Sequence, residues 1–264
     1  MMSMAEMSHE LQLTKANRLQ LARAFRHNLR VDYSIDCVIE GQMGRAYTDD
    51  LSSPTAYRIT IGPFWYFAGD ADNPGGRALL SEWPPYNLLM PSPPEWAAAA
   101  KAMFGEKLVA FPRYSFAAGD LSEAHLAALL DNSPHREHVV PLDGPLVARL
   151  AGSEHGYLDV EDFDSPADFL ERSVGFAALA GDAVMGVAYG SLACSRGIEV
   201  SLFVEEAYRR QGVATALASR LILTCLREGR RPNWDAANPE SCRLAEKLGF
   251  VFTQAYEAYY RQPE

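Results

Sequence analysis

Apolar and polar positions in the last third of the chain alternate in blocks that predict a run of strands and helices. Short apolar blocks are typical of buried strands, whereas a longer block that is apolar on most sides predicts a helix packed on a sheet. Glycine and proline mark where blocks end and begin. The predicted elements are a strand over 198–204, a helix from Val213 to near Gly229, a strand over 232–238 that runs into a polar turn, and a helix over 240–248 begun by Pro239 and closed by Gly249-Phe250.

The first half of the chain predicts a second α/β region. β-Branched and aromatic residues indicate its strands, and amphipathic or alanine-rich runs indicate its helices. In chain order the predicted elements are a helix over 11–28, strands over 33–40, 44–51 and 56–67, a turn over 73–76, a short strand over 86–90, a helix over 93–104 and a strand over 107–116. The aromatic residues at 64–67, Trp83, Tyr86 and Trp96 are expected to fill its core rather than to line a cleft.

The middle of the chain predicts a linker, helices and a hairpin. A small-residue segment, 117–120, is typical of a linker that ends in a helix cap, and helices are predicted over 121–130 and from Ser165-Pro166. A weakly charged apolar run follows, and Gly181-Asp182 interrupts it. The interruption favours a hairpin over a membrane span, with strands over 174–180 and 184–190.

The turn before the helix at Val213 carries Arg209-Arg210-Gln211-Gly212-Val213-Ala214, called here the 209–214 turn. The first turn of a helix has backbone N–H groups without intrahelical partners and the positive end of the helix dipole, so a pyrophosphate can bind there. Gly212 lets the backbone approach such a ligand, and Arg209 and Arg210 add positive charge. Taken alone, such a fragment is more often a helix start that binds nothing.

Together with its neighbours, this turn resembles the acyl-CoA motif of the GNAT superfamily of N-acetyltransferases. The family motif, Gln/Arg-x-x-Gly-x-Gly/Ala after the fourth strand, is filled by Arg209, Gly212 and Ala214. The second half of the acetyl-CoA site is similar to that of a subgroup resembling the zwittermicin-resistance acetyltransferases, on the residues 234–238, Ser241 and 247–250. The resemblance is strong over 198–260 and weaker elsewhere.

This resemblance implies a mixed α/β fold with a GNAT-type acetyltransferase domain at the C-terminus, over 118–264. The N-terminal domain, 1–117, approximates the same order of elements without a phosphate-binding turn. It is therefore expected to be a smaller α/β domain, either a degenerate GNAT-like half or an α/β cap, that shapes the substrate cleft.

The resemblance also implies acetyl-CoA as the cosubstrate. A backbone N–H near Val204 is implied as the donor to the oxyanion of the tetrahedral intermediate. Asn238 and Ser241 can hydrogen-bond the pantetheine arm, while Asn238 can also cap the helix begun by Pro239. The expected cofactor-binding residues are Leu202, Phe203, Val204, Arg209, Arg210, Gln211, Gly212, Val213, Ala214, Asn238 and Ser241.

The implied reaction, direct attack of a neutral primary amine on the thioester, needs a base. Glu199, on the strand that flanks the cleft in this fold, is the leading candidate, acting directly or through water. The alternative is a strand-edge glutamate that lies in solvent or pairs with an arginine. In a regular strand Glu199 and Phe203 lie on one face, and Val200, Leu202 and Val204 lie on the other. A bulge would therefore decide which face of the strand carries the Glu199 side chain.

The thiolate leaving group raises the question of an acid. Many GNAT enzymes carry a tyrosine four residues before the terminal glycine of the last helix, where this chain has Ala245. Tyr256, Tyr259 and Tyr260 are weak candidates to replace it, although tyrosines at such positions are more often packing residues. Alternatively the thiolate leaves unassisted, because a thiol pKa near about 8.5 makes it a tolerable leaving group.

Composition limits the partners. The chain has 264 residues and a formal net charge of −10, which argues against a nucleic-acid partner and allows a cationic amine substrate. The start of the chain has no basic segment followed by an apolar one, so a cytoplasmic protein without membrane attachment is expected. As oligomer, a monomer or a homodimer is expected.

Neither the cysteines nor the histidines suggest a metal site. Cys37, Cys194, Cys225 and Cys242 show no paired spacing and are interpreted as buried or incidental thiols rather than disulfides or ligands. His135 and His138 lie three residues apart, but their flanks are typical of a solvated loop, so a surface pair is the better interpretation.

Two classes of function follow from the sequence. The first is an N-acetyltransferase that acetylates a small polar amine. The resemblance to zwittermicin-resistance acetyltransferases implies an antibiotic-like or aminoalcohol compound, which makes antibiotic resistance a candidate role. The second is a non-catalytic acyl-CoA-binding sensor, which the alanine at position 245 keeps open. Release of the coenzyme A thiol in the presence of an amine separates the two.

Overall fold

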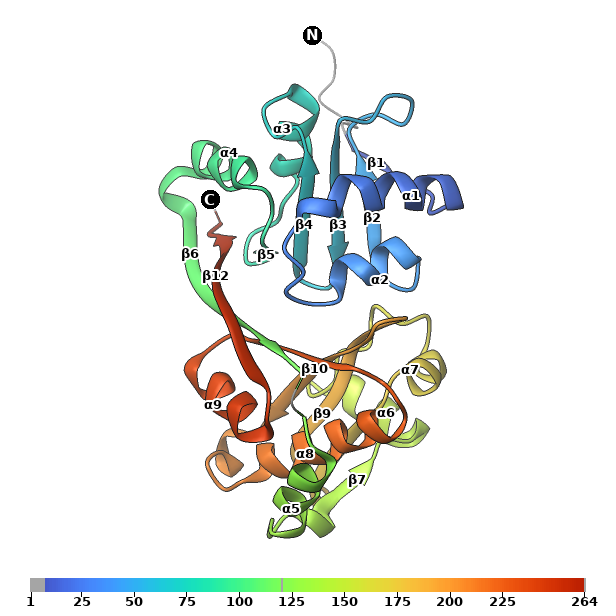
Figure 1. Ribbon diagram of the computed structural model, residues 1–264, viewed down its shortest axis with the longest axis vertical. Coiled ribbons are helices and arrows are strands. Elements are labelled where there is room, and N and C mark those ends of the chain that lie inside the picture. Colours follow the sequence, from blue (N-terminus) through green and yellow to red (C-terminus); the bar gives the residue numbers. More distant parts are fainter. Residues whose placement is uncertain (1–7, 120, 264) are drawn as a thin grey trace. The chain divides into compact units, whose positions relative to one another are not determined.

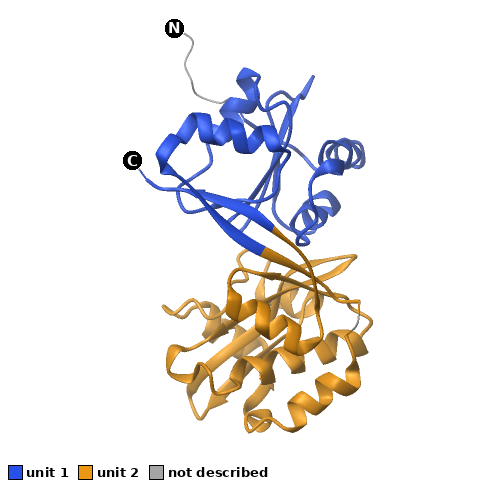
Figure 2. Ribbon diagram, turned by 60° about the vertical axis from the view of Figure 1, so that its left-hand side comes forward, with its two compact units in different colours: residues 1–113, 256–264 blue, residues 114–255 orange. Residues whose placement is uncertain are grey.

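Two units, each with its own hydrophobic core, make up the computed structural model, which describes residues 8–119 and 121–263 (Figure 2). Unit 1 comprises residues 1–113 and 256–264, and unit 2 comprises residues 114–255. The division falls within the strands β6 (Leu108–Ala117) and β12 (Val251–Arg261). The expectation that the chain has no export segment concerns its first residues, which lie largely outside the described residues. Asp120 of the predicted linker also lies outside them.

Unit 2 contains the elements around the 209–214 turn (Figure 1). Its strand order is β6, β11, β10, β9, β8, β7, with β10 and β11 parallel and the other neighbours antiparallel. The strands are β7 (Val139–Pro141), β8 (Gly175–Ala180), β9 (Ala183–Cys194), β10 (Gly197–Val204) and β11 (Pro232–Ala236). The helices are α5 (Glu123–Asp131), α6 (Gly144–Ala151), α7 (Pro166–Arg172), α8 (Val213–Arg227) and α9 (Pro239–Leu248), with short 3-10 helices η3 (Arg136–His138) and η4 (Glu206–Tyr208).

The sequence predictions for unit 2 are confirmed in element type. The strand over 198–204 is part of β10, the helix from Val213 is α8, and the two following elements are β11 and α9. The apolar run around Gly181 forms the antiparallel hairpin of β8 and β9. Among the helices of the described residues, none is long and apolar enough to cross a membrane.

The core of unit 2 forms where α8 and α9 pack on β11. Ala218 and Ile222 of α8, Trp234 of β11, and Ala245 and Leu248 of α9 belong to one buried cluster. The buried positions of α8 recur at the spacing of a helix face, so the apolar block that predicts the helix also supplies its packing surface. This packing fixes the beginning of α8 relative to the end of β10.

Unit 1 has the strand order β1, β2, β3, β4, β5, β12, with β4 and β5 parallel and the other pairs antiparallel. Its further strands are β1 (His9–Glu10), β2 (Arg45–Thr48), β3 (Ala56–Ile61), β4 (Phe64–Gly69) and β5 (Leu88–Leu89). Its helices are α1 (Lys15–Ala24), α2 (Ser34–Glu40), α3 (Pro74–Ser81) and α4 (Pro94–Phe104), with 3-10 helices η1 (Phe25–His27) and η2 (Gly105–Lys107).

Three predictions in unit 1 are wrong. The segment 33–40 is the helix α2 rather than a strand, with one buried face and a left-handed Gly41 (φ 66°) at its end. The segment 56–67 is a hairpin of two strands that turns at Gly62. The segment 73–76 is the first turn of α3, where the Asn73 side chain caps the helix and Pro74 follows it.

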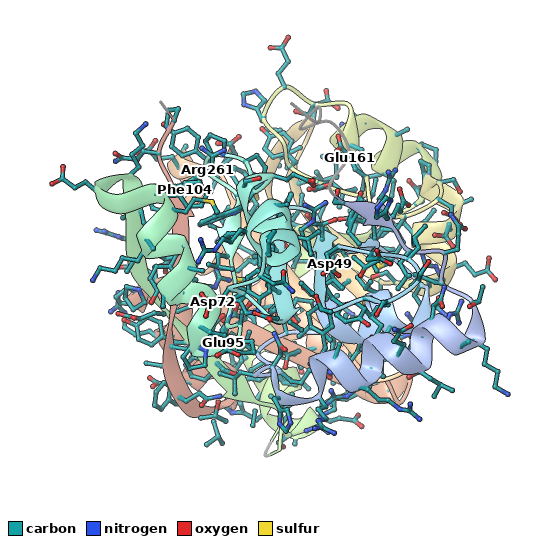
Figure 3. All side chains as sticks on the ribbon, turned by 90° about the horizontal axis from the view of Figure 1, so that it is seen from above. Asp49, Asp72, Glu95, Phe104, Glu161 and Arg261 are labelled. Carbon is teal, nitrogen blue, oxygen red and sulfur yellow. The ribbon has the colours of Figure 1, made fainter. Side chains whose placement is uncertain are left out.

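Aromatic side chains fill the core of unit 1, as predicted for most of them. Phe67, Trp83 and Trp96 are fully buried, and the Phe67 and Trp96 rings stack with centroids 4.8 Å apart. Tyr86 does not belong to this core, because 64% of it is exposed. The end of β12 is held in the same unit, where the Arg261 guanidinium lies 5.0 Å over the Phe104 ring (Figure 3).

The two units repeat one order of elements. The series β1, α1, α2, β2, β3, β4, α3, β5, α4 is followed in the second half of the chain by β7, α6, α7, β8, β9, β10, α8, β11, α9. The parallel pair of β4 and β5 in unit 1 thus corresponds to the parallel pair of β10 and β11 in unit 2. The final strand of each series pairs with the other half: β6 with β11, and β12 with β5.

Candidate functional site

The first turn of α8 differs from most other helix beginnings because, among the described residues, no side chain accepts a hydrogen bond from its N–H groups. The N-cap residue of α8 is Gly212, which has φ 92° and no side chain to accept a hydrogen bond from the first turn. Side chains cap most of the other described α-helices, namely Thr14, Asn73, Ser122, Asp143, Ser165 and Asn238. The beginning of α8 therefore keeps backbone donors and the positive end of the helix dipole available to an anion.

The 209–214 turn is held by its own hydrogen bonds. Arg209 donates from Nε to the Val204 carbonyl at 3.1 Å, and Gln211 donates from Nε2 to the Ala207 carbonyl at 2.7 Å. Arg210 adopts φ 61°, a left-handed conformation that is uncommon outside glycine, and Gly212 follows two residues later in the same region. Residues 209–212 are exposed, so two guanidinium groups and the backbone of Gly212 face solvent.

The strands β10 and β11 pair over only two residues before they diverge. Their parallel ladder joins Ile198 to Pro232 and Glu199 to Asn233. Beyond this point β11 continues its pairing with β6, and β10 continues with β9. The first three residues of β10 are buried, and residues 200–204 are only half-buried. The far half of β10, which includes Leu202, Phe203 and Val204, thus offers a strand edge on the side of β11 to an extended ligand that contains amides.

Glu199 lies at the last residue pair of this ladder. Its side chain is buried, and its Oε2 accepts a hydrogen bond of 2.8 Å from Nδ2 of Asn233. This burial excludes the alternative of a glutamate that lies in solvent. The register with β9 shifts between Glu199 and Val200, so the bulge that would reorient this side chain is present.

Asn238 and Ser241 are both engaged at the beginning of α9. Asn238 accepts from the backbone N–H of Ser241 at 2.9 Å, and the Ser241 hydroxyl accepts from the Trp234 indole N–H at 3.1 Å. The predicted capping role of Asn238 is therefore real. Its amide Nδ2 is a donor on an exposed residue, which is the part of the side chain suited to a ligand carbonyl.

The positions considered for an acid are occupied by packing or by local partners. Ala245 is fully buried in the core of unit 2. Tyr256, in unit 1, accepts from Nε of Arg113 at 3.3 Å, and Tyr260 packs its ring against other aromatic rings of that unit. Tyr259 donates to Glu257 at 2.9 Å, and burial together with this hydrogen bond raises the pKa of Tyr259.

His135 is the site residue that sequence reasoning missed. Its Nε2 lies 2.9 Å from the carbonyl oxygen of Gln211, in the middle of the 209–214 turn, although the two residues are 76 positions apart. No sequence signal connects them, because the contact depends on the packing of α5 against α8. In the described part of the chain no group of three or more His, Cys, Asp or Glu side chains is arranged to hold a metal ion.

Comparisons with known proteins agree on one family. A sequence model described as GNAT acetyltransferase matches residues 27–259. The uncharacterized N-acetyltransferase YdfB of Bacillus subtilis (strain 168) is 25% identical over 227 residues, which cover 82% of this chain and 85% of that protein. A crystal structure of a GCN5-related N-acetyltransferase-like protein from Streptococcus suis 89/1591 matches with a TM-score of 0.83 and 30% identity, over 94% of this chain and 100% of that one.

A solved tandem GNAT protein from the clavulanic acid biosynthesis pathway is a more distant match. It has a TM-score of 0.53 and 13% identity, over 97% of this chain and 99% of that chain. At this identity the likeness concerns the fold alone. It extends over both units of the present chain, so the repeated order of elements has a counterpart in another structure.

Proposed function

Because the chain belongs to the GNAT acetyltransferase family, whose members use acetyl-CoA, we propose that this N-acetyltransferase moves an acetyl group from acetyl-CoA to a primary amine of a small polar molecule. The observation that carries the proposal is the uncapped first turn of α8 behind Arg209 and Arg210. The resemblance of 234–238, Ser241 and 247–250 to zwittermicin-resistance acetyltransferases supports an antibiotic-like or aminoalcohol acceptor, and a role in antibiotic resistance.

The cosubstrate would bind along one continuous path in unit 2. Its pyrophosphate would accept hydrogen bonds from the N–H groups of Gly212, Val213 and Ala214, with Arg209 and Arg210 nearby to balance its charge. The pantetheine arm would lie along the open edge of β10, where its amides can pair with the backbone of residues 202–204. The amide of Asn238 would donate to the same arm from the beginning of α9, with Ser241 beside it.

The chemical step would take place near the point where β10 and β11 part. The amine nitrogen would form a bond to the acetyl carbon, and Glu199 would accept the amine proton directly or through one water molecule. A backbone N–H near Val204 would stabilise the oxyanion of the tetrahedral intermediate. Collapse of this tetrahedral intermediate would break the carbon–sulfur bond and release coenzyme A as a thiolate.

The buried alanine at position 245 favours departure of the thiolate without a dedicated acid in unit 2. A thiol with a pKa of about 8.5 is largely able to leave as its anion near neutral pH. Tyr256, Tyr259 and Tyr260 stay the candidates for proton return. A loss of turnover in Tyr259→Phe that is absent in Tyr260→Phe would assign that role to Tyr259.

The N-terminal repeat, assigned to residues 1–117, is proposed to be a degenerate GNAT-like half that binds no acyl-CoA. Its counterpart of α8 is α3, whose first turn is already occupied by side chains. Asn73 accepts from the N–H of Gly76 at 2.6 Å, and Asp70 accepts from the N–H groups of Asp72 and Asn73 at 2.9 and 3.2 Å.

A further carboxylate lies beside the same helix end. A Cβ placed on Gly75 would lie 2.8 Å from Oδ2 of Asp49, so this carboxylate sits beside the first turn of α3 (Figure 3). Asp49, Asp70 and Asp72 place negative charge where the other half has Arg209 and Arg210. Pyrophosphate would meet satisfied N–H groups and like charge there, which supports one acyl-CoA site for each chain.

Two measurements test the proposed function. Calorimetric titration with coenzyme A is expected to give one site for each chain, and two sites would contradict the degenerate half. Thiol release from acetyl-CoA is then measured with a panel of amines, among them aminoalcohols and polyamines. Tight binding of coenzyme A without thiol release in the presence of any amine would contradict the proposed enzyme and support a non-catalytic acyl-CoA-binding sensor.

A further inference from the structure

His135 contacts the 209–214 turn from outside it. Its Nε2 lies 2.9 Å from the Gln211 carbonyl oxygen, which can only accept, so Nε2 carries the proton and donates. The Cδ2 atom of the same ring lies 4.0 Å from where a Cβ of Gly212 would be, the nearest neighbour of that position. The ring thus contacts Gln211 and lies beside Gly212, the two residues of the peptide that leads into α8.

The geometry of this peptide makes the contact consequential. Gln211 lies between Arg210 (φ 61°) and Gly212 (φ 92°), two left-handed residues that allow the carbonyl several directions. In a trans peptide the C=O and the following N–H point in opposite directions. Because His135 holds the Gln211 carbonyl, the Gly212 N–H is directed away from the ring, and a donor for the pyrophosphate is oriented before the ligand arrives.

His135 is itself held in place by unit 2. It follows α5, whose Leu126 belongs to the same buried cluster as Ala218 and Ile222 of α8. The backbone N–H of His135 donates to the Ser133 hydroxyl at 3.2 Å, and its carbonyl accepts from the His138 N–H at 3.0 Å. The His135 ring is therefore held by a segment that packs in the same core as α8, and it supports the turn that precedes α8.

The second ring nitrogen of His135, Nδ1, makes no hydrogen bond comparable to that of Nε2 in the part of the chain that the structure describes. Nδ1 of His135 is buried, and among the described residues it has no hydrogen-bond partner. The hydrogen bond to Gln211 is thus the one that the ring makes in the described part of the chain. His138, three residues later and with its centroid 5.8 Å from that of His135, is exposed and provides a natural comparison.

We infer that His135 is a positioning residue that holds the 209–214 turn in the form that receives the pyrophosphate of acyl-CoA, an inference that rests on the proposed function. Loss of one hydrogen bond of this kind weakens binding by about fivefold to tenfold. The weakening should concern ligands that contain the pyrophosphate. Loss of this hydrogen bond should leave the rate of the chemical step unchanged, because His135 contacts neither β10 nor Glu199.

The test compares acetyl-CoA with S-acetylpantetheine, which lacks the pyrophosphate. His135→Ala is expected to raise the Kd for coenzyme A and the KM for acetyl-CoA by about fivefold to tenfold, with kcat unchanged. The kcat/KM for S-acetylpantetheine should equal that of the unmodified protein. His135→Gln, whose amide nitrogen can take the place of Nε2, should restore most of the affinity, and His138→Ala should have no effect.

Three results would overturn the inference. Equal affinity of His135→Ala and the unmodified protein for coenzyme A would remove the role of the contact. Equal loss with both acetyl donors, or failure of His135→Gln to recover affinity while its melting temperature is unchanged, would show a general structural role. If the unmodified protein binds no coenzyme A, the proposed function falls and the inference falls with it.

Discussion

The amide of Asn233 donates a hydrogen bond of 2.8 Å to the carboxylate of Glu199 at the last residue pair that joins β10 to β11. The bond fixes one oxygen of a buried side chain at the place where the two strands separate. A base in this reaction must be held within reach of the amine proton, and a neutral amide partner orients a carboxylate without neutralising its charge. The role of Glu199 as the base can therefore be tested separately from the binding of coenzyme A.

Glu199→Gln is expected to lower kcat by about a hundredfold, because the amide keeps an acceptor for Asn233 but cannot take up a proton. The Kd for coenzyme A should stay unchanged, since the pyrophosphate site lies at the other end of β10. Asn233→Ala is the matched control: the base is retained but less well held, so a smaller loss is expected. Unchanged turnover of Glu199→Gln across the pH range would remove this residue from the mechanism.

Gly212→Ala is expected to weaken coenzyme A binding because Gly212 adopts φ 92°, where a side chain is strained by about 1 kcal/mol. The matched control is Gly181→Ala in the β8–β9 hairpin, where φ is 62° and no atom lies within 4 Å of the added Cβ. Both variants should lose similar stability in urea unfolding. Only Gly212→Ala should lose affinity in calorimetry, and a parallel loss in Gly181→Ala would attribute the effect to stability alone.

Local signals made unit 2 predictable. Strong apolar blocks, bounded by glycine and proline, define β10, α8, β11 and α9, and the glycine at 212 marks the turn before α8. In unit 1 the same reasoning failed at 33–40, because the apolar Ile35, Cys37 and Val38 are as compatible with a strand as with the buried face of α2. The turn signals Asn73-Pro74-Gly75-Gly76 were those of a helix start, in which Gly76 lies against the backbone of Asp70.

Features of the site that depend on tertiary contacts could not be predicted. His135 reaches Gln211, and Asp49 reaches the first turn of α3, only after the helices have packed. The Glu199 bulge could be named as a requirement from strand parity, but its presence is set by the register with β9. Sequence patterns thus identified the residues of the turn, and packing decided which distant side chains support it.

Asp49→Asn is expected to destabilise unit 1 at neutral pH by about 1 kcal/mol. Burial raises the pKa of Asp49, but hydrogen bonds from Thr55 and Ala56 outweigh burial and hold that pKa below its usual value. A carboxyl with a depressed folded-state pKa contributes stability above its unfolded pKa of about 3.9 and loses it as the pH falls through the folded value.

The pH dependence of this difference is the measurement. Urea unfolding of both proteins should give a constant gap in unfolding free energy above about pH 5 and a shrinking gap below about pH 4. Glu106→Gln, at an exposed position of unit 1, serves as the control for a general change in charge. A gap for Asp49→Asn that grows on acidification would contradict the assigned hydrogen bonds.

Cys225, on the inward face of α8, is expected to resist alkylation in the native protein. Burial raises the pKa of its thiol to about 12, so at pH 8 roughly one molecule in ten thousand carries the reactive thiolate. Cys242 is half-buried, and burial followed by the charge of Glu246 raises its pKa as well, so it should react slowly yet before Cys225. Peptide mapping after iodoacetamide treatment, with and without guanidinium, measures both; rapid native labelling of Cys225 would contradict the packing of α8.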